Sequence, residues 1–257
     1  MAHQLKKSNT VQYLTQNISD DAVASTIKEK ILSKTPYALS RLGDGEIYLI
    51  NDNAPESLIQ KICELWRIPR SLYEKFRLKT VENILNPMIQ QTDILGLLSP
   101  TNEVCQTIRY DSKKWSLPVQ YVKELRSDIP HICDHLLPRS KAFGDINNFK
   151  DILSGRSLNI ISPNVELLNK DLSTILDASV NITIISNDRS DLLRKLDMIK
   201  EEVVIYGASL TGKDIGVILK KQGKVCIDFG ATLDAWANIS SRQWFQVGGL
   251  QRHCVIE

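Results

Sequence analysis

The sequence predicts an α/β protein, formed as a single Rossmann-like domain with a mostly parallel β-sheet flanked by helices. In the second half of the chain, short β-branched runs alternate with segments whose apolar residues recur at helical spacing. The length of 257 residues and the hydrophobic content of 42% suffice for one large core. No repeat, low-complexity tract or linker-like stretch divides the sequence, so we expect one domain over residues 1–257, with 1–20 as a flexible N-terminal segment.

In the first half, helices and strands alternate less regularly. The expected elements are helices at 22–32, after the turn at 43–46, at 57–66 and at 71–91, and strands at 37–42 and 93–98. Pro87 is expected to break the helix at 71–91, because proline lacks a backbone N–H and clashes with the preceding turn. Residues 101–150 indicate helix and loop without clear boundaries.

The second half carries the regular alternation. Four buried parallel strands are expected, at 158–162, 182–186, 203–207 and 225–229. The helices between them are expected at 165–176, 191–199 and 213–222, with Gly223 ending the last one. Repeated β-α units imply an open, doubly wound sheet with right-handed crossovers.

Composition excludes several classes of protein. The 32 Lys and Arg against 30 Asp and Glu leave a charge of +2, so nucleic acid is not an expected partner. The five cysteines form no C-x-x-C pair, which excludes a disulfide framework and favours reduced thiols in the cytoplasm. No apolar stretch approaches the roughly 18 residues of a membrane span. We therefore expect no integral membrane segment, and peripheral attachment to the inner face of the membrane stays open.

The turn Gly-Asp-Gly-Glu at 43–46 is the most informative local feature. Asp44 and Glu46 are two residues apart, and in an extended segment their carboxylates would project to the same side. A Mg²⁺ or Mn²⁺ ion could be shared between them, since such ions take one or two protein carboxylates plus substrate phosphates. Gly43 and Gly45 leave room for a phosphate to approach. The alternative is an acidic turn that caps the following helix.

A second candidate is the segment 207–213, which follows a predicted strand and opens a helix. Its backbone amides could therefore receive an anion. The segment nearly matches the P-loop pattern G-x-x-x-x-G-K-[ST], but Asp214 stands where that pattern needs a hydroxyl for magnesium. Contact with phosphate without NTP hydrolysis is favoured, and a plain strand-to-helix turn is the alternative.

Other residues carry weaker signals. The histidines and cysteine at 131–135 lie in a short stretch that we expect to be irregular, and we expect no metal there. No G-x-S-x-G elbow and no cysteine nucleophile signature is present. The four tryptophans are expected in core packing, although one could stack on a base or sugar ring. They are Trp66, Trp115, Trp236 and Trp244.

Residues 40–46, S-R-L-G-D-G-E, resemble the S-R-[FL]-G-D-G-E signature of bacterial glycosyltransferases of the D-type fold (GT-D), long catalogued as a domain of unknown function. A second stretch agrees in the same order along the chain. Residues 204–213 and 222–236 are similar to that family's closing strand, G-x-T-x-K-like turn, helix and I-D-x-G strand with a following acidic-aromatic stretch. Two separated matches are more specific than either alone.

The resemblance implies transfer of a sugar from a nucleotide-diphosphate donor, with a UDP-sugar expected, to a saccharide, lipid-linked or protein-linked acceptor in bacterial surface-glycan assembly. By match to the motif, Asp44 and Glu46 take the catalytic and metal-binding roles and hold Mn²⁺ or Mg²⁺ against the diphosphate. The other residues that the resemblance assigns to the donor site are Arg41, Gly43, Gly45, Thr211 and Lys213.

The chain departs from the family at Ala231, where a histidine is common, and the middle third matches its motifs poorly. No acceptor, sugar or catalytic base is therefore assigned. The alternative functions are a non-catalytic nucleotide-binding Rossmann-like module and a partner domain in a glycan-assembly complex. The first would favour a G-x-G-x-x-G motif that the sequence lacks. A partner domain without catalysis could lose Asp44 and Glu46, so their presence argues against the second alternative. Whether the chain forms a homo-oligomer stays open.

Overall fold

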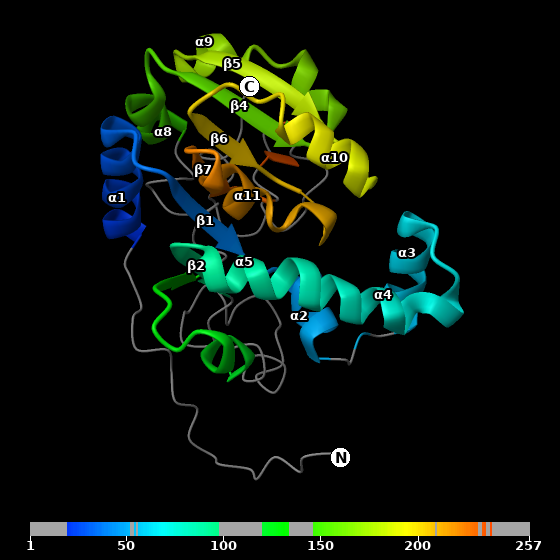
Figure 1. Ribbon diagram of the computed structural model, residues 1–257. Coiled ribbons are helices and arrows are strands. Elements are labelled where there is room, and N and C mark those ends of the chain that lie inside the picture. The colour runs from blue at the N-terminus through cyan, green and yellow to red at the C-terminus, as the bar shows by residue number, and fades with distance from the viewer. Residues whose placement is uncertain are drawn as a thin grey trace, which may run out of the picture.

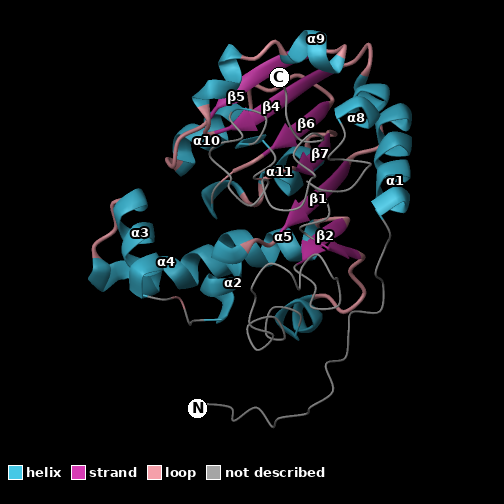
Figure 2. Ribbon diagram, turned by 180° about the vertical axis from the view of Figure 1, so that it is seen from behind, coloured by secondary structure: helices cyan, strands magenta, loops and turns pink. Residues whose placement is uncertain are grey.

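The structure, a computed structural model, describes residues 20–51, 54, 56–97, 120–133, 146–208, 210–230, 233–234 and 237. Within these ranges, seven strands form one sheet in the order β3-β2-β1-β7-β6-β4-β5. Every neighbouring pair runs parallel. Helices lie on both sides of the sheet (Figures 1 and 2). The predicted α/β architecture with a mostly parallel sheet is confirmed.

The strands are short, and all except β3 and β5 lie close to their expected positions. They are β1 (Tyr37–Arg41), β2 (Ile94–Leu97), β3 (His131–Cys133), β4 (Ser157–Ser162), β5 (Ser179–Ile184), β6 (Val203–Tyr206) and β7 (Val225–Asp228). At the centre of the sheet, β1 pairs with β2 through Leu39 and Ile94, and with β7 through Leu39 and Ile227. The first and last of the described strands are therefore neighbours.

The helices form two layers. They are α1 (Asp20–Ser33), α2 (Asp44–Asn51), α3 (Glu56–Trp66), α4 (Tyr73–Thr80), α5 (Asn86–Gln91), α8 (Ile146–Leu153), α9 (Leu172–Leu176), α10 (Arg189–Leu196) and α11 (Ile215–Lys221). Single turns of 3-10 helix lie at η1 (Arg70–Leu72), η3 (Val165–Asn169) and η4 (Leu210–Gly212), and a π-helical turn at η2 (Val81–Leu85). Residues 120–125 are also helical. None of the described helices is long and apolar enough to cross a membrane.

The core has two halves because alternate residues of a strand point to opposite faces of a sheet. Leu39, Ile205 and Ile227 pack with α1, α8 and α9 on one face. Tyr206 and Cys226 pack with α10 and α11 on the other, where a further cluster joins α2 through α5 to β2. The sheet is thus buried on both faces at its centre, as all-parallel sheets require.

The expected break at Pro87 is wrong. Residues 73–91 run as one continuous helical segment from α4 through η2 to α5 (Figure 1). The π-helical turn at Val81–Leu85 lies directly before Asn86 and Pro87. A π turn shifts the backbone hydrogen bonds by one residue, so the helix accommodates proline without ending.

The single helix expected at 165–176 is also wrong, because two capping side chains divide it. The Asn164 side chain accepts from the Glu166 N–H and begins η3, and the Asp171 side chain accepts from the Thr174 N–H and begins α9. Each cap satisfies a backbone N–H that would otherwise lack a partner, which makes two short helices possible.

Two expectations about strands also need correction. The strand expected at 182–186 begins earlier, at Ser179, and forms the edge of the sheet beyond β4, so it is only partly buried. Residues 131–133, expected to be irregular, form β3 at the other edge, and Asp134 and His135 lie outside the described residues. Gly223, with φ of +88°, ends α11 as expected.

Candidate functional site

Three loops meet at the carboxyl edge of the sheet. They follow β1 (43–46), β6 (207–214) and β7 (from Phe229), and these three strands are neighbours. Within the sheet, β2 and β3 lie on one side of β1, whereas β7 is its neighbour on the other side. Open α/β sheets bind ligands where the strand order reverses in this way.

A cluster of three charged side chains lies at this edge. The Nζ of Lys213 is 3.4 Å from Oδ2 of Asp228 and 3.7 Å from Oε2 of Glu46. Each of the three side chains is at most 8% exposed. One ammonium thus faces two carboxylates, and we call Glu46, Lys213 and Asp228 the lysine cluster. Buried charges of this kind need partners of opposite sign. Because the cluster has two carboxylates and one ammonium, it favours the binding of a further cation beside it.

Glu46 also caps a helix. Its Oε2 accepts a hydrogen bond of 2.7 Å from the Gly43 N–H, the residue before α2. This is the contact that a glutamate in the first turn makes in a capping box. The expectation of an extended segment is wrong, because Asp44 to Glu46 form the first turn of α2, where residues i and i+2 do not face each other. The Asp44 side chain lies outside the described residues.

The protonation of Glu46 is set by competing effects. Burial raises the pKa of its carboxyl above the ordinary value, and the charge of Asp228 adds to that increase. The Lys213 ammonium and the Gly43 N–H lower the pKa, because both favour the carboxylate. Burial is the largest of these effects.

The loop after β6 places Thr211 and Lys213 together, as expected. Both residues are buried, and the hydroxyl Oγ1 of Thr211 has no hydrogen-bond partner among the described residues. A buried hydroxyl without a partner is unfavourable unless a ligand or water completes it. Asp214, which replaces the hydroxyl of the P-loop pattern, faces Arg189 instead of the lysine cluster.

Arg41 connects β1 to the segment after β7. Its Nη1 donates a hydrogen bond of 2.9 Å to the carbonyl oxygen of Phe229. Gly230 has a φ of +45°, and a Cβ there would lie 2.8 Å from Nη1 of Arg41. Asp228 accepts from the Gly230 N–H at 2.9 Å, so the turn after β7 contacts both Arg41 and the lysine cluster.

The two motifs read from the sequence are therefore brought together. Glu46 meets Lys213, and a Cβ on Gly45 would lie 3.8 Å from the Leu210 side chain. Sequence reasoning placed Asp228 in the matched I-D-x-G strand without a site role, and it did not single out Arg189. Asp228 carried a usable signal, because an acidic residue that ends a buried apolar strand lies at the carboxyl edge. Arg189 carried none, because one arginine at a helix start is common on protein surfaces.

Mg²⁺ or Mn²⁺ is compatible with the donor chemistry of this edge. Such ions need only one or two protein carboxylates when phosphates and water complete the shell. The contacts of Glu46 with the Gly43 N–H and with Lys213 both involve Oε2. The other carboxylate oxygen, Oε1, takes part in neither contact and is the one that could bind a metal. No group of three or more His, Cys, Asp or Glu among the described residues could hold a metal. Among the described side chains, the fit therefore rests on Glu46.

The expected tryptophan packing is observed for Trp66. Its ring lies 5.5 Å from that of Phe76, tilted by 44°, and this contact joins α3 to α4. Trp115, Trp236 and Trp244 lie outside the described residues. Trp66 is therefore part of the helical layer, in the role expected for it.

Comparisons with known proteins identify the family and the fold of this chain. A family model described as a GT-D fold-like domain matches residues 18–236, which include the whole lysine cluster. No curated protein matches this chain.

Solved structures share the fold. A selenomethionine-substituted structure of domain of unknown function 1792 has a TM-score of 0.53 and 14% identity, covering 92% of this chain and 83% of that chain. A structure of the same domain, described as having a distinct glycosyltransferase fold, has a TM-score of 0.53 and 15% identity, with the same coverage. A new glycosyltransferase (DUF1792) from Streptococcus sanguinis has a TM-score of 0.51 and 16% identity, covering 91% of this chain and 85% of that chain.

Proposed function

Since the chain belongs to the family of GT-D fold-like domains, we propose that it is a glycosyltransferase. The family and fold that the sequence motifs implied are confirmed by the comparisons. We propose further that it transfers a hexose from a nucleotide-diphosphate donor, with UDP as the expected nucleotide. The acceptor would be a saccharide, free or linked to lipid or protein, in bacterial surface-glycan assembly on the cytoplasmic side.

The lysine cluster is the observation that supports this proposal. A sugar leaves its nucleotide as a diphosphate, on which negative charge increases in the transition state. Lys213 is a buried cation at the carboxyl edge, and Thr211 has a hydroxyl without a partner in the described part of the chain. Because both groups are held before a ligand arrives, they would stabilise the leaving diphosphate without reorganisation.

The carboxylates have a separate role. Glu46 and Asp44 would hold Mn²⁺ or Mg²⁺, which supplies positive charge to the leaving diphosphate when bound. Asp228 keeps the Lys213 ammonium in place from the other side. Arg41 fixes the turn after β7 through the Phe229 carbonyl, and thereby the position of Asp228.

The decisive experiment is a panel of nucleotide sugars tested for binding and hydrolysis with Mn²⁺, with Mg²⁺ and with EDTA. We expect one UDP-sugar to raise the melting temperature in a metal-dependent way and to be hydrolysed slowly without acceptor. Binding of no nucleotide sugar under any condition would contradict the proposal. Binding without hydrolysis or transfer to any glycan acceptor would favour a non-catalytic nucleotide-binding module.

The biological role needs its own test. Deleting the gene in its host should change the mass or composition of surface polysaccharide or glycoprotein, and the protein should fractionate with the cytoplasm or the inner membrane face. Unaltered glycans would contradict the proposed role but not the proposed chemistry.

A further inference from the structure

Arg189, the first residue of α10, contacts the loop that carries Thr211 and Lys213. Its Nη1 donates to Oδ1 of Asp214 at 2.6 Å, and its Nη2 donates to Oδ2 at 2.5 Å. Nη1 also donates to the carbonyl oxygen of Thr211. One guanidinium therefore holds the loop at two points, on either side of Lys213.

The geometry of this contact is specific. The Asp214 side chain is 8% exposed and that of Arg189 is 31% exposed, so water competes little for the carboxylate. A bidentate arginine–carboxylate pair fixes both the distance and the orientation of its partners, which a lysine cannot do. Asp214 occupies the N-cap position of α11, yet its side chain makes no capping hydrogen bond. Its carboxylate faces Arg189 instead.

The loop itself has little room to move. Gly212 lies so close to Ala208 that a Cβ would overlap that residue, and the same Cβ would be 2.9 Å from the Ile215 side chain. On the other side, α10 is a firm support, because the Asp188 carboxylate accepts from the N–H groups of Ser190 and Asp191. Arg189 thus connects a tight loop to a capped helix.

We propose that Arg189 is a positioning residue for the donor diphosphate, which holds Thr211 and Lys213 in the geometry that receives the phosphate oxygens. The inference rests on the proposed function, because it takes the loop to be the diphosphate site. Arg189 acts through Asp214 and the Thr211 carbonyl and does not contact the ligand. Outer residues that orient binding groups in this way typically change affinity or activity by tenfold or more when they are altered.

The test compares Arg189→Lys with Arg194→Lys. Arg194 lies on the same helix and pairs with Asp191, but its side chain is 67% exposed, so it is a matched control. We expect Arg189→Lys to weaken UDP binding about tenfold, with little change in uridine binding or melting temperature. Asp214→Asn should also weaken UDP binding, and the double variant should lose less than the two single losses combined, because both single variants disrupt the same bidentate contact.

Hydrogen exchange over residues 207–214 tests the anchoring without any ligand. Exchange should be faster in Arg189→Lys than in the wild type and unchanged in Arg194→Lys. Unchanged exchange, or UDP affinity equal to that of Arg194→Lys, would overturn the inference. An equal loss of UDP and uridine binding with a lower melting temperature would also overturn it, by showing a purely structural role. A wild-type protein that binds no nucleoside diphosphate would instead contradict the proposed function, while the exchange data still decide whether Arg189 anchors the loop.

Discussion

The ammonium nitrogen of Lys213 lies 3.4 Å from the carboxylate of Asp228, and both side chains are almost completely buried. Lys213 lies in the loop after β6, and Asp228 is the last residue of β7. Their contact joins the neighbouring strands at the edge where the ligand site is proposed. Changes to either residue should therefore affect binding of a phosphate ligand, and they should also lower stability, because the remaining charge would be buried without its partner.

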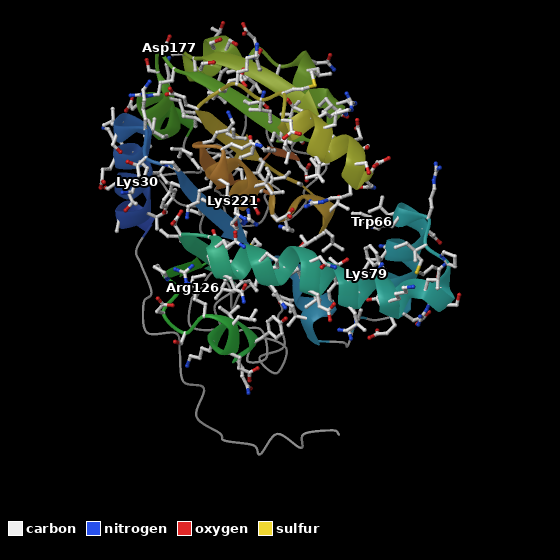
Figure 3. The ribbon with its side chains drawn as sticks, viewed as in Figure 1. Lys30, Trp66, Lys79, Arg126, Asp177 and Lys221 are labelled. Atoms are coloured by element: carbon white, nitrogen blue, oxygen red, sulfur yellow. The ribbon has the colours of Figure 1, made fainter. Side chains whose placement is uncertain are left out.

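Lys213→Ala should weaken binding of a nucleoside diphosphate more than binding of the nucleoside, because only the diphosphate carries the charge that the ammonium would meet. The ratio of the two affinities, measured by calorimetry, is the readout. Lys221→Ala is the control, because Lys221 is an exposed residue at the other end of α11 (Figure 3). Equal losses for both ligands in Lys213→Ala would show that Lys213 acts on folding or on the base.

Glu46→Gln and Asp44→Asn should abolish the metal-dependent part of UDP binding, since an amide is a poor ligand for Mg²⁺ or Mn²⁺. The affinity for UDP is measured by titration once with Mn²⁺ and once with EDTA, and the difference between the two affinities is the metal-dependent part. Glu166→Gln, at an exposed position of η3, should keep it. Glu46→Ala should in addition destabilise the fold by about 1 kcal/mol, because it removes the cap on the Gly43 N–H. Metal-dependent binding that persists in both amide variants would contradict the assignment.

Burial of Glu46 should make the stability of the protein depend on pH. Because the pKa of this carboxyl is raised on folding, its contribution to the free energy of unfolding is complete below its unfolded value of about 4.5. The contribution is lost as pH rises through the folded pKa. Urea unfolding of the wild type and of Glu46→Gln should show this as a difference, with the wild type losing stability relative to the variant as pH increases.

Lys213 and Asp228 face the same carboxyl, and both are unchanged in Glu46→Gln, so the comparison isolates Glu46. Stability curves that stay parallel across the acid range would contradict a raised pKa.

Gly230→Ala should destabilise the protein more than Gly223→Ala. Both glycines have a positive φ, so both substitutions carry backbone strain of about 1 kcal/mol. A Cβ on Gly223 meets nothing within 4 Å, whereas a Cβ on Gly230 meets the Arg41 guanidinium. The further cost at Gly230 should be about 1–3 kcal/mol, measured by denaturant unfolding. If both substitutions lowered the free energy of unfolding equally, Arg41 could move away from the new Cβ without a cost in stability.

The sequence predicts the β-α alternation well because each buried strand is a short apolar run between polar turns. It does not predict the order of the strands, since β1 and β7 are distant in the chain and no local pattern specifies their pairing. The caps at Asn164 and Asp171 were local signals for two short helices, and helical periodicity masked them.

For the site, the motif around Glu46 and the glycine-rich segment around Lys213 could be found separately. Their contact could not, because it depends on which loops the sheet brings together. The role of Arg189 follows only from its contact with Asp214, which the sequence does not show. The sequence therefore identified the loops of the site more readily than the interactions that hold them.

The position of β7 between β1 and β6 also determines when the site can form during synthesis. Arg41 and its partner Phe229 are separated by 188 positions along the chain. A ribosome releases the Gly-Asp-Gly-Glu turn long before Asp228 and β7, the strand that pairs with β1 at the centre of the sheet. Pairing of such distant segments is the slow part of folding. A nascent chain that ends before β7 therefore contains the acidic motif without its neighbouring strand, and we expect ligand binding only after β7 has paired with β1.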